Sequence, residues 1–140
     1  MTFTRDPNRF YATLGTGDDI YLVAGNLARK TLDVVAEDVE CPSISPDGTR
    51  LAFKRRSGGS FGPVTWRLAV FDLASGRVIP LAERRNVDDQ VEWLDDDRIL
   101  YGLGRTGSGR TDVWRVDADG SGTPVRLLTN AWSPSVASPS

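Results

Sequence analysis

Histidine is absent from this sequence, and cysteine occurs once, as Cys41. The absence of histidine excludes a Ser-His-Asp triad, a Cys-His dyad and any imidazole ligand for a metal within these residues. A single cysteine excludes an intrachain disulfide and a cysteine-rich zinc site. The residues therefore predict no catalytic group, no metal site and no cofactor, and we expect a chain that is not an enzyme.

Long apolar runs and a strong net charge are also missing. No run approaches the roughly 18 residues that a membrane-spanning helix needs, and residues 1–10 lack the apolar stretch of a signal peptide. The formal net charge of −2 gives no general attraction to nucleic acid or to anionic lipid. We therefore expect no membrane insertion and no nucleic-acid partner.

Glycine and proline, by contrast, are frequent, with 14 and 8 residues among 140. They recur between short apolar runs, which indicates an all-β protein with tight turns. The clearest turn is Ser45-Pro46-Asp47-Gly48. Pro46 fixes its φ at about −65°, the Asp47 side chain can accept hydrogen bonds from nearby backbone N–H groups, and Gly48 tolerates a positive φ.

The residues around this turn belong to a repeat. Residues 45–53 align with residues 93–101 and, more weakly, with residues 4–12. Each copy is followed by two further strand-like runs, and four-stranded repeats of about 40 to 50 residues are typical of β-propeller blades. We expect three four-stranded antiparallel blades and one extra strand, which begins a further blade, over these ranges: 1–36, 41–82, 89–128 and 134–138.

The third strands of the first two repeats support this interpretation. Residues 20–23 and 68–71 are apolar without alternation. Both faces of their sheets must therefore be covered. Blades stacked face to face around an axis provide that cover, whereas a two-layer sandwich would leave one face polar.

Residues 42–53 and 112–122 resemble the repeats of TolB-like β-propellers, as do residues 126–129. The resemblance is weaker at residues 5–8 and 94–97, which replace the Ser-Pro-Asp-Gly turn. It implies a six-bladed ring, of which this chain is similar to one half. It also implies a scaffold that contacts its partner through the rim and central channel, and a periplasmic or other extracytoplasmic place in the bacterial envelope.

Three blades cannot close a ring, because the outer blades would expose apolar faces and strand edges. Either the remaining blades belong to a longer chain, or a homodimer completes a six-bladed ring. The unmatched strand at 134–138 favours the first alternative.

Two motifs have competing interpretations. Residues 102–107 match G-x-G-x-x-G, but a dinucleotide site needs a helix after the loop, so we prefer a hairpin loop. Asp117, Asp119 and Gly120 imitate the start of a calcium loop, although its twelfth position falls on Leu128 rather than on a glutamate. We therefore predict a structural turn there, as at 45–48.

Carboxylate pairs raise the question of a cation. Residues 95–97 occupy the turn position that 46–48 fill in the preceding repeat, so we expect solvated turn residues. Asp88 and Asp89 precede a first strand at the edge of the expected channel. They are the one alternative to the prediction of no metal site, because clustered oxygens can hold a hard cation.

In a propeller, the loops between second and third strands and the loops between blades lie on one face, the rim. We predict that the following rim residues contact a partner: Arg56, Phe61, Arg84, Arg85, Asn86, Asp88, Asp89, Arg105, Arg110 and Trp132. Because the charges are mixed, a protein or peptide suits this face better than nucleic acid. Phe61 and Trp132 lie in loops, where they either anchor the partner or cap a neighbouring blade.

Two functions remain open from the sequence. The first is a non-catalytic TolB-like scaffold that binds a protein or peptide through its loop rim. The alternative is the propeller that gates a prolyl-oligopeptidase-type serine peptidase, whose catalytic domain would lie outside these residues. A small-ligand or sugar site in the channel is a third option, without a specific residue behind it.

Overall fold

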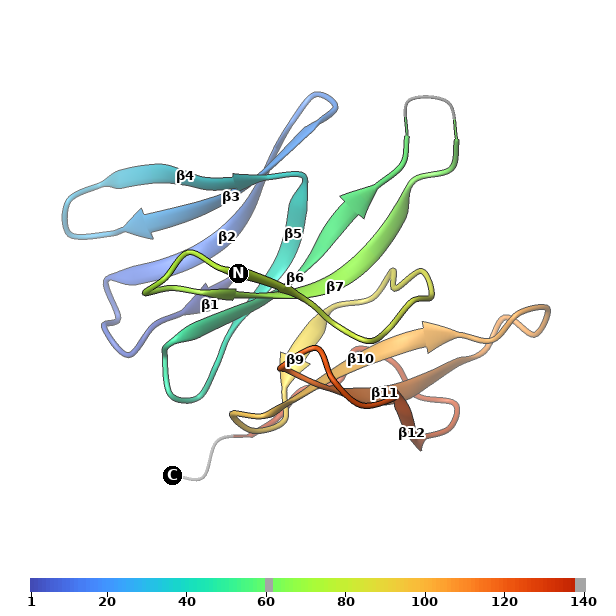
Figure 1. Ribbon diagram of the computed structural model, residues 1–140. Coiled ribbons are helices and arrows are strands. Elements are labelled where there is room, and N and C mark those ends of the chain that lie inside the picture. Colours follow the sequence, from blue (N-terminus) through green and yellow to red (C-terminus); the bar gives the residue numbers. More distant parts are fainter. Residues whose placement is uncertain (60–61, 138–140) are drawn as a thin grey trace.

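The computed structural model describes residues 1–59 and 62–137, and these residues form three separate four-stranded sheets (Figure 1). In each sheet the strands follow one another in sequence order, and neighbouring strands are antiparallel. The described residues contain no helix. The expected all-β propeller segment with three four-stranded antiparallel blades is therefore confirmed.

The sheets are numbered here as blades 1 to 3. Blade 1 contains β1 (Thr2–Phe3), β2 (Arg9–Thr16), β3 (Asp19–Asn26) and β4 (Thr31–Glu37). Blade 2 contains β5 (Val39–Ile44), β6 (Arg50–Ser57), β7 (Thr65–Asp72) and β8 (Val78–Pro80). Blade 3 contains β9 (Val91–Trp93), β10 (Arg98–Gly104), β11 (Thr111–Asp117) and β12 (Val125–Leu128). The second strands all begin at an arginine, in agreement with the alignment of the repeats.

The expected strand at 134–138 is not found in the described residues. Residues 134–137 have no strand assignment, and Ser138 lies outside the part that the structure describes. A strand forms only where a neighbouring strand takes up its backbone hydrogen bonds. None of the twelve described strands pairs with this segment.

The predicted turn at 45–48 joins β5 to β6. The Gly48 N–H donates to the carbonyl of Ser45 at 2.8 Å, and Gly48 has a φ of 78°. The Asp47 carboxylate accepts from the backbone N–H of Thr49 at 3.0 Å. Burial alone would raise the pKa of Asp47, but hydrogen bonds from Ser45 and Thr49 outweigh it and hold that pKa below its usual value.

Blade 2 lies between the other two blades and buries both of its faces (Figure 1). Leu51 and Phe53 pack with Leu22 toward blade 1, whereas Ala52 packs in the same cluster as Tyr101 toward blade 3. Successive residues of a strand point to opposite faces. Residues 51–53 of β6 are therefore all apolar because blade 1 covers one face of the sheet and blade 3 covers the other.

The first strand of blade 2 pairs with β6 along one edge only, and side chains of blade 1 meet its free edge. The N–H of Cys41 donates to the hydroxyl of Thr13 at 3.0 Å, and the N–H of Ile44 donates to the hydroxyl of Thr2 at 3.2 Å. These bonds satisfy backbone groups that no strand reaches.

Blade 3 meets the same strand from the other side. The indole N–H of Trp93 donates to the carbonyl of Ser43 at 2.8 Å, and the Ser43 hydroxyl donates to Glu92 at 3.2 Å. Burial raises the pKa of Glu92, and the single bond from Ser43 only partly offsets that effect.

The equivalent turns of the three blades are also linked. The Arg5 guanidinium donates to the carbonyl of Pro46 at 3.0 Å, and the N–H of Asp47 donates to the Asp96 carboxylate at 2.8 Å. Arg50 donates to the carbonyl of Asp96 as well. Hydrogen bonds thus fix the blades against one another at the end of the molecule opposite the rim.

We expect Trp93→Phe to lower the free energy of unfolding by about 1–3 kcal/mol, because the buried carbonyl of Ser43 loses its donor. Trp93→Ala also removes the ring and should cost about 3–5 kcal/mol. Urea titration measures both effects. Trp132→Phe, at a side chain that is 69% exposed, is the control and should stay within about 0.5 kcal/mol of the unchanged protein. Equal stability of the Trp93→Phe variant would contradict the role of this bond.

Glu92→Gln should raise the melting temperature at neutral pH. A carboxyl group whose folded pKa lies above its unfolded value of about 4.5 stabilises the fold at low pH and loses that contribution as the pH rises. The neutral amide avoids this loss and still accepts the bond from Ser43. Thermal unfolding followed by circular dichroism should show the gap closing below pH 4.5. Glu37→Gln, at an exposed end of β4, is the control variant.

Candidate functional site

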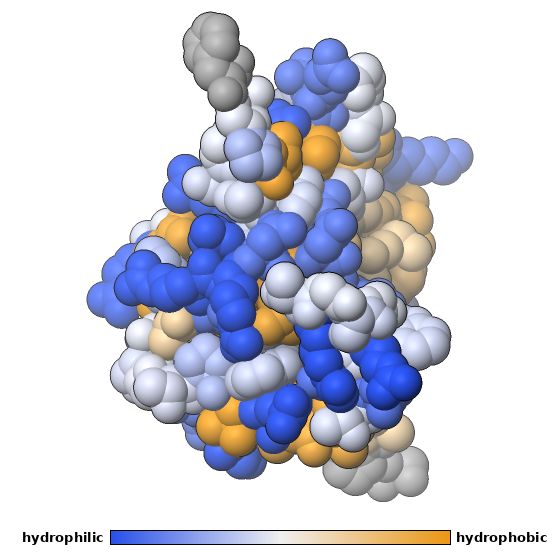
Figure 2. Space-filling model, turned by 90° about the vertical axis from the view of Figure 1, so that its right-hand side faces the viewer, coloured by the Kyte–Doolittle hydropathy of each residue, from blue (hydrophilic) through white to orange (hydrophobic). Residues whose placement is uncertain are grey.

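The loops that follow the second strands gather on one side of the molecule. The β10–β11 loop projects to the right in Figure 1, and Figure 2 looks onto that side. The surface there is mainly hydrophilic, with small hydrophobic patches between the polar side chains. This surface is the rim, where the sequence predicts the partner-binding residues.

A cavity of about 540 Å³ opens on the rim beside blade 3. We call it the rim hollow. Its polar and aromatic walls come from the β8–β9 linker, the β10–β11 hairpin and the segment after β12: Asn86, Asp88, Asp89, Arg105, Thr106 and Trp132. Five of the ten predicted rim residues therefore lie around one cavity.

Trp132 stands in this wall with 69% of its surface exposed, although the chain on either side is firmly held. The backbone N–H of Ser133 donates to Asp89 at 2.6 Å, and the Ser133 hydroxyl donates to the same carboxylate at 2.9 Å. Ser133 also has a φ of 48°, a conformation that residues other than glycine rarely adopt. The contacts of Asp89 thus hold a strained backbone that presents the indole.

The residues before Trp132 are anchored to the start of β11. The N–H of Asn130 donates to the Asp112 carboxylate at 3.0 Å, and the N–H of Ala131 donates to the carbonyl of Thr111 at 3.0 Å. Asn130 also has a positive φ, of 54°. Trp132 therefore has an exposed side chain on a backbone that hydrogen bonds hold in place. A partner that binds the indole would need to order little of this backbone.

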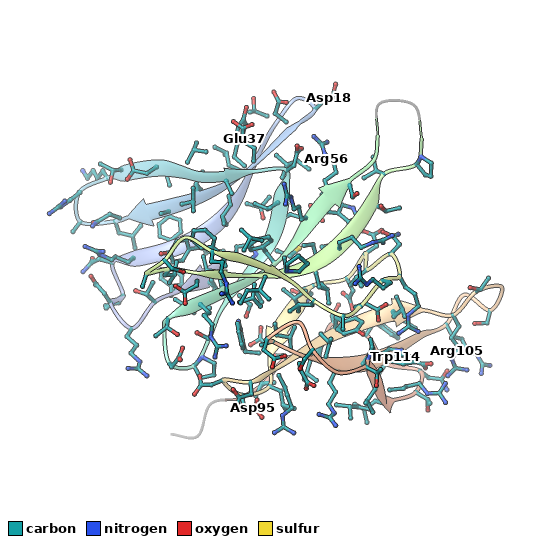
Figure 3. All side chains as sticks on the ribbon, viewed as in Figure 1. Asp18, Glu37, Arg56, Asp95, Arg105 and Trp114 are labelled. Carbon is teal, nitrogen blue, oxygen red and sulfur yellow. The ribbon has the colours of Figure 1, made fainter. Side chains whose placement is uncertain are left out.

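Asp112 is buried, with 1% of its side chain exposed, and holds two arginines. Arg105 donates two bonds to it, at 2.7 and 2.6 Å, and Arg126 lies at 3.4 Å. The bonds from Arg105 are the largest cause that holds the pKa of Asp112 far below its usual value. Arg105 is therefore fixed at the wall of the rim hollow, and Figure 3 shows it near the tip of blade 3.

Glycines form the floor of the rim hollow. A Cβ at Gly102 would lie 2.0 Å from the Asp89 carboxylate, so only glycine leaves room for that side chain. A Cβ at Gly104 would meet nothing within 4 Å. Gly104 thus faces open space, where a side chain would fill the cavity without a clash.

Lys54 lies next to the rim hollow and was missed by the sequence analysis. Its side chain is 3% exposed, and its ammonium group lies 2.9 Å from Glu40 and 3.8 Å from Asp88. The same group lies 5.3 Å from the ring centroid of Trp66. A lysine directly after the apolar run of residues 51–53 is the signal that would have drawn attention to it, since buried charges need partners.

Arg85 serves the blade 2–blade 3 interface instead of the rim hollow. It pairs with the buried Glu83 at 2.7 Å, and its guanidinium lies 4.1 Å from the ring centroid of Trp114. The Tyr101 hydroxyl donates to Glu83 as well. Burial would raise the pKa of Glu83, but the bonds from Arg85 and Tyr101 lower it overall. Burial and the bond to Glu83 both raise the pKa of Tyr101.

The other predicted rim residues lie apart from the rim hollow. Arg56 pairs with Asp38 on the linker between blades 1 and 2 and donates to the carbonyl of Asp18 in blade 1 at 3.2 Å (Figure 3). Arg84 and Arg110 are exposed and do not line the cavity. Phe61 lies outside the described residues.

The predicted turn at Asp117, Asp119 and Gly120 links β11 to β12. The Asp119 carboxylate accepts from the N–H of Ser121 at 2.8 Å, and Gly120 has a φ of 83°. A Cβ at Gly120 would lie 2.8 Å from the carbonyl oxygen of Pro80, so glycine permits the approach of blade 2. Asp119 and Gly120 thus take part in a hydrogen-bonded turn against blade 2.

The remaining acidic motifs have local partners. Asp95 pairs with Arg98 and accepts from the N–H of Asp97 at 3.0 Å, and the Arg98 bond is the largest cause of its lowered pKa. Within residues 1–59 and 62–137, no group of three or more acidic or cysteine side chains is placed to hold a metal ion. The cation alternative for Asp88 and Asp89 thus gains no support from metal-site geometry.

Two glycine motifs belong to hairpins. Residues 102–107 run from β10 into a loop that leads directly to β11, with no helix between them. Residues 58–62 match the letters of the nucleophile elbow, G-x-S-x-G, but they join the antiparallel strands β6 and β7. An elbow joins a strand to a helix and works with a histidine, which this sequence lacks.

A second cavity, of about 680 Å³, opens where the first strands of the three blades meet. Thr2, Arg5, Ser43 and Glu92 contribute to its walls. The sequence analysis did not single out this group. Its members come from three repeats, and only packing of the blades brings them together.

No helix among the described residues is long and apolar enough to cross a membrane.

The fold is that of a β-propeller segment, and it is similar to solved propellers that include TolB. The crystal structure of TolB from Acinetobacter baumannii superposes on 90% of this chain with a TM-score of 0.71 and 20% identity, and the match covers 31% of that chain. The β-propeller domain of the Trilobed protease from Pyrococcus furiosus matches 86% of this chain with a TM-score of 0.59 and 21% identity. That match covers 39% of the propeller domain. No protein-family model matches the sequence.

Among curated proteins, the chain is similar to dipeptidyl-peptidase 5. It is 29% identical over 91 residues to the probable enzyme of Aspergillus flavus and to that of Aspergillus oryzae. The aligned part is 64% of this chain but 12% of each relative. The chain therefore spans a small part of the relatives that it matches.

Asp112→Asn should lower the melting temperature at neutral pH, because the amide cannot hold Arg105 and Arg126 as the carboxylate does. A carboxyl group with a depressed folded pKa stabilises the fold above its unfolded value of about 3.8, and this contribution disappears as the pH falls through the folded pKa. Thermal unfolding across pH should therefore show the variant approaching the unchanged protein in strong acid. Asp33→Asn on β4 is the exposed control. A pH-independent difference would contradict the assignment.

Proposed function

We propose that this chain is a non-catalytic β-propeller segment that binds a protein or peptide through its rim. The anchored, exposed indole of Trp132 at the mouth of a cavity is the observation that carries this proposal. Tryptophan is enriched among the residues that dominate binding energies. The backbone on either side of Trp132 is held by hydrogen bonds, so less of the chain has to be ordered on association.

The surroundings of Trp132 support a peptide more than a small apolar ligand. The cavity offers the amide of Asn86, the hydroxyl of Thr106 and the carboxylate of Asp88 around an open glycine floor. A peptide backbone needs donors, acceptors and close approach, and glycine permits that approach.

We expect Trp132→Ala to weaken binding about tenfold or more, since removal of a central aromatic anchor costs at least 1–2 kcal/mol. The probe is a set of peptides selected from a random phage-displayed library on the immobilised unchanged protein. Their affinities are then measured for each variant by surface plasmon resonance. Leu27→Ala, at an exposed residue between β3 and β4, is the control and should retain affinity. Peptides that bind both variants equally would place the site elsewhere.

A second candidate is the propeller of a peptidase, in which it would gate access to a separate catalytic domain. The similarity to dipeptidyl-peptidase 5 favours it, as does the likeness to acylaminoacyl peptidase from Pyrococcus horikoshii, with a TM-score of 0.58. The absence of histidine leaves the catalytic groups to another part of such a protein. Sequencing the adjoining coding region separates the candidates: an in-frame nucleophile elbow followed by a histidine supports the peptidase, and further propeller repeats alone support the scaffold.

A further inference from the structure

The blade 2 counterpart of the rim hollow is occupied by the protein's own cations. Lys54 and Arg56 are the fifth and seventh residues of β6, and both extend toward carboxylates at the rim. Lys54 pairs with Glu40 on the first strand of its own blade, and Arg56 pairs with Asp38 on the linker before that strand. Each carboxylate near blade 2 therefore has a cation.

The same positions in blade 3 are glycines. Gly102 and Gly104 are the fifth and seventh residues of β10, so they correspond to Lys54 and Arg56. The linkers align in the same way. The N–H of Asp38 donates to the carbonyl of Ile20 at 2.8 Å, as the N–H of Val87 donates to that of Trp66 at 3.1 Å.

This alignment makes Asp89 the counterpart of Glu40. Glu40 has a lysine beside it, whereas Asp89 lies against the bare backbone of Gly102. Its neighbour Asp88 is 77% exposed and lies 3.8 Å from the ammonium group of Lys54. Blade 3 thus keeps a carboxylate at the position of Glu40, has Val87 at the position of Asp38, and lacks both of the long cations that reach such groups in blade 2.

We infer that the rim hollow receives a lysine or arginine side chain of a bound peptide, in the space that a cation of the protein occupies in blade 2. This inference rests on the proposed peptide-binding function and names the side chain that is recognised. Asp88 and Asp89 supply negative charge, and Gly104 leaves the path open.

The aromatic component of the site also has a counterpart in blade 2. The ammonium group of Lys54 lies 5.3 Å from the ring centroid of Trp66. At the rim hollow the exposed indole of Trp132 offers a ring to an incoming cation. Cations are attracted to the faces of aromatic rings, most strongly to tryptophan.

The other charged groups around the cavity are already engaged. Arg105 and Arg126 both pair with the buried Asp112. Lys54 pairs with Glu40. Asp88, which lies 3.8 Å from Lys54, and Asp89, which accepts hydrogen bonds from Ser133, carry the negative charge that a ligand meets at this cavity.

Nuclear magnetic resonance of the nitrogen-labelled protein tests the inference with terminally blocked tripeptides. The probes are acetyl-Gly-Lys-Gly-amide, its arginine analogue and the neutral norleucine analogue, so that no free amino terminus contributes. We expect the lysine and arginine peptides to shift the Trp132 indole and the Gly102 and Gly104 amide resonances. The norleucine peptide should bind about tenfold more weakly, because it lacks the charge that the indole and carboxylates attract. Equal shifts with norleucine, shifts confined to other residues, or no shift with any probe would overturn the inference.

Two variants give a matched comparison. Gly104→Leu should fill the cavity and abolish the shifts while the fold is kept, since a Cβ there meets nothing within 4 Å. Gly15→Leu is the control, because Gly15 is the seventh residue of β2, the blade 1 counterpart of Gly104, and is equally open. Asp88→Asn tests the charge at an exposed position and should weaken the lysine peptide about tenfold. Binding that survives Gly104→Leu or Asp88→Asn would contradict the assigned site.

The outcome also separates this inference from the proposed function. Peptides selected on the rim that lack lysine and arginine, yet depend on Trp132, would leave the function in place and refute the cationic side chain. If no selected peptide depends on Trp132, the proposed function fails together with the inference.

Discussion

The free edge of β5 is the feature on which the arrangement of blades depends. A first strand in a propeller pairs along one side only, so its other backbone groups need partners from elsewhere. Here Thr13 and Thr2 of blade 1 accept from Cys41 and Ile44, and Trp93 of blade 3 donates to Ser43. The same hydrogen bonds that satisfy the edge therefore set the position of both neighbouring blades.

In a repeat protein, single residues can differ between repeats while the strand order stays the same, and blade 3 is an example. Gly102 and Gly104 stand where blade 2 has Lys54 and Arg56, while the strands around them keep their order. Blade 2 uses the long side chains to neutralise its own carboxylates and to reach blade 1. The glycines of blade 3 leave a cavity there instead. Glycines at these two positions thus accompany an accessible surface where blade 2 has two ion pairs.

The fold could be predicted from the sequence because the features that indicate it lie within short stretches of residues. The turn at 45–48 and the strand-like runs around it recur, and the second strands begin at the aligned arginines Arg9, Arg50 and Arg98. Apolar runs without alternation also indicated sheets covered on both faces, and blade 2 shows such cover. Residues 134–137 have no strand assignment, and a strand there would need a pairing partner that a repeat pattern cannot supply.

The candidate site could be predicted from the sequence only in part. Asn86, Asp88, Asp89, Arg105 and Trp132 were placed on the rim by topology, but nothing in their spacing indicated that they would surround one cavity. Arg56 and Arg85 belong to the same predicted group, yet each is engaged in contacts between blades. The sequence alone does not distinguish a charged residue that faces solvent from one that contacts a neighbouring blade.

The sequence by itself determined the repeat, the turns and the antiparallel strand order, since these follow from the residue types within a few positions of one another. Only the tertiary structure decided that Glu40 and Lys54 form a pair, that Asp89 lies on Gly102, and that Trp132 is held exposed. Such contacts depend on how separate repeats pack. Packing is a property of the whole arrangement of blades, and no single stretch of residues contains it.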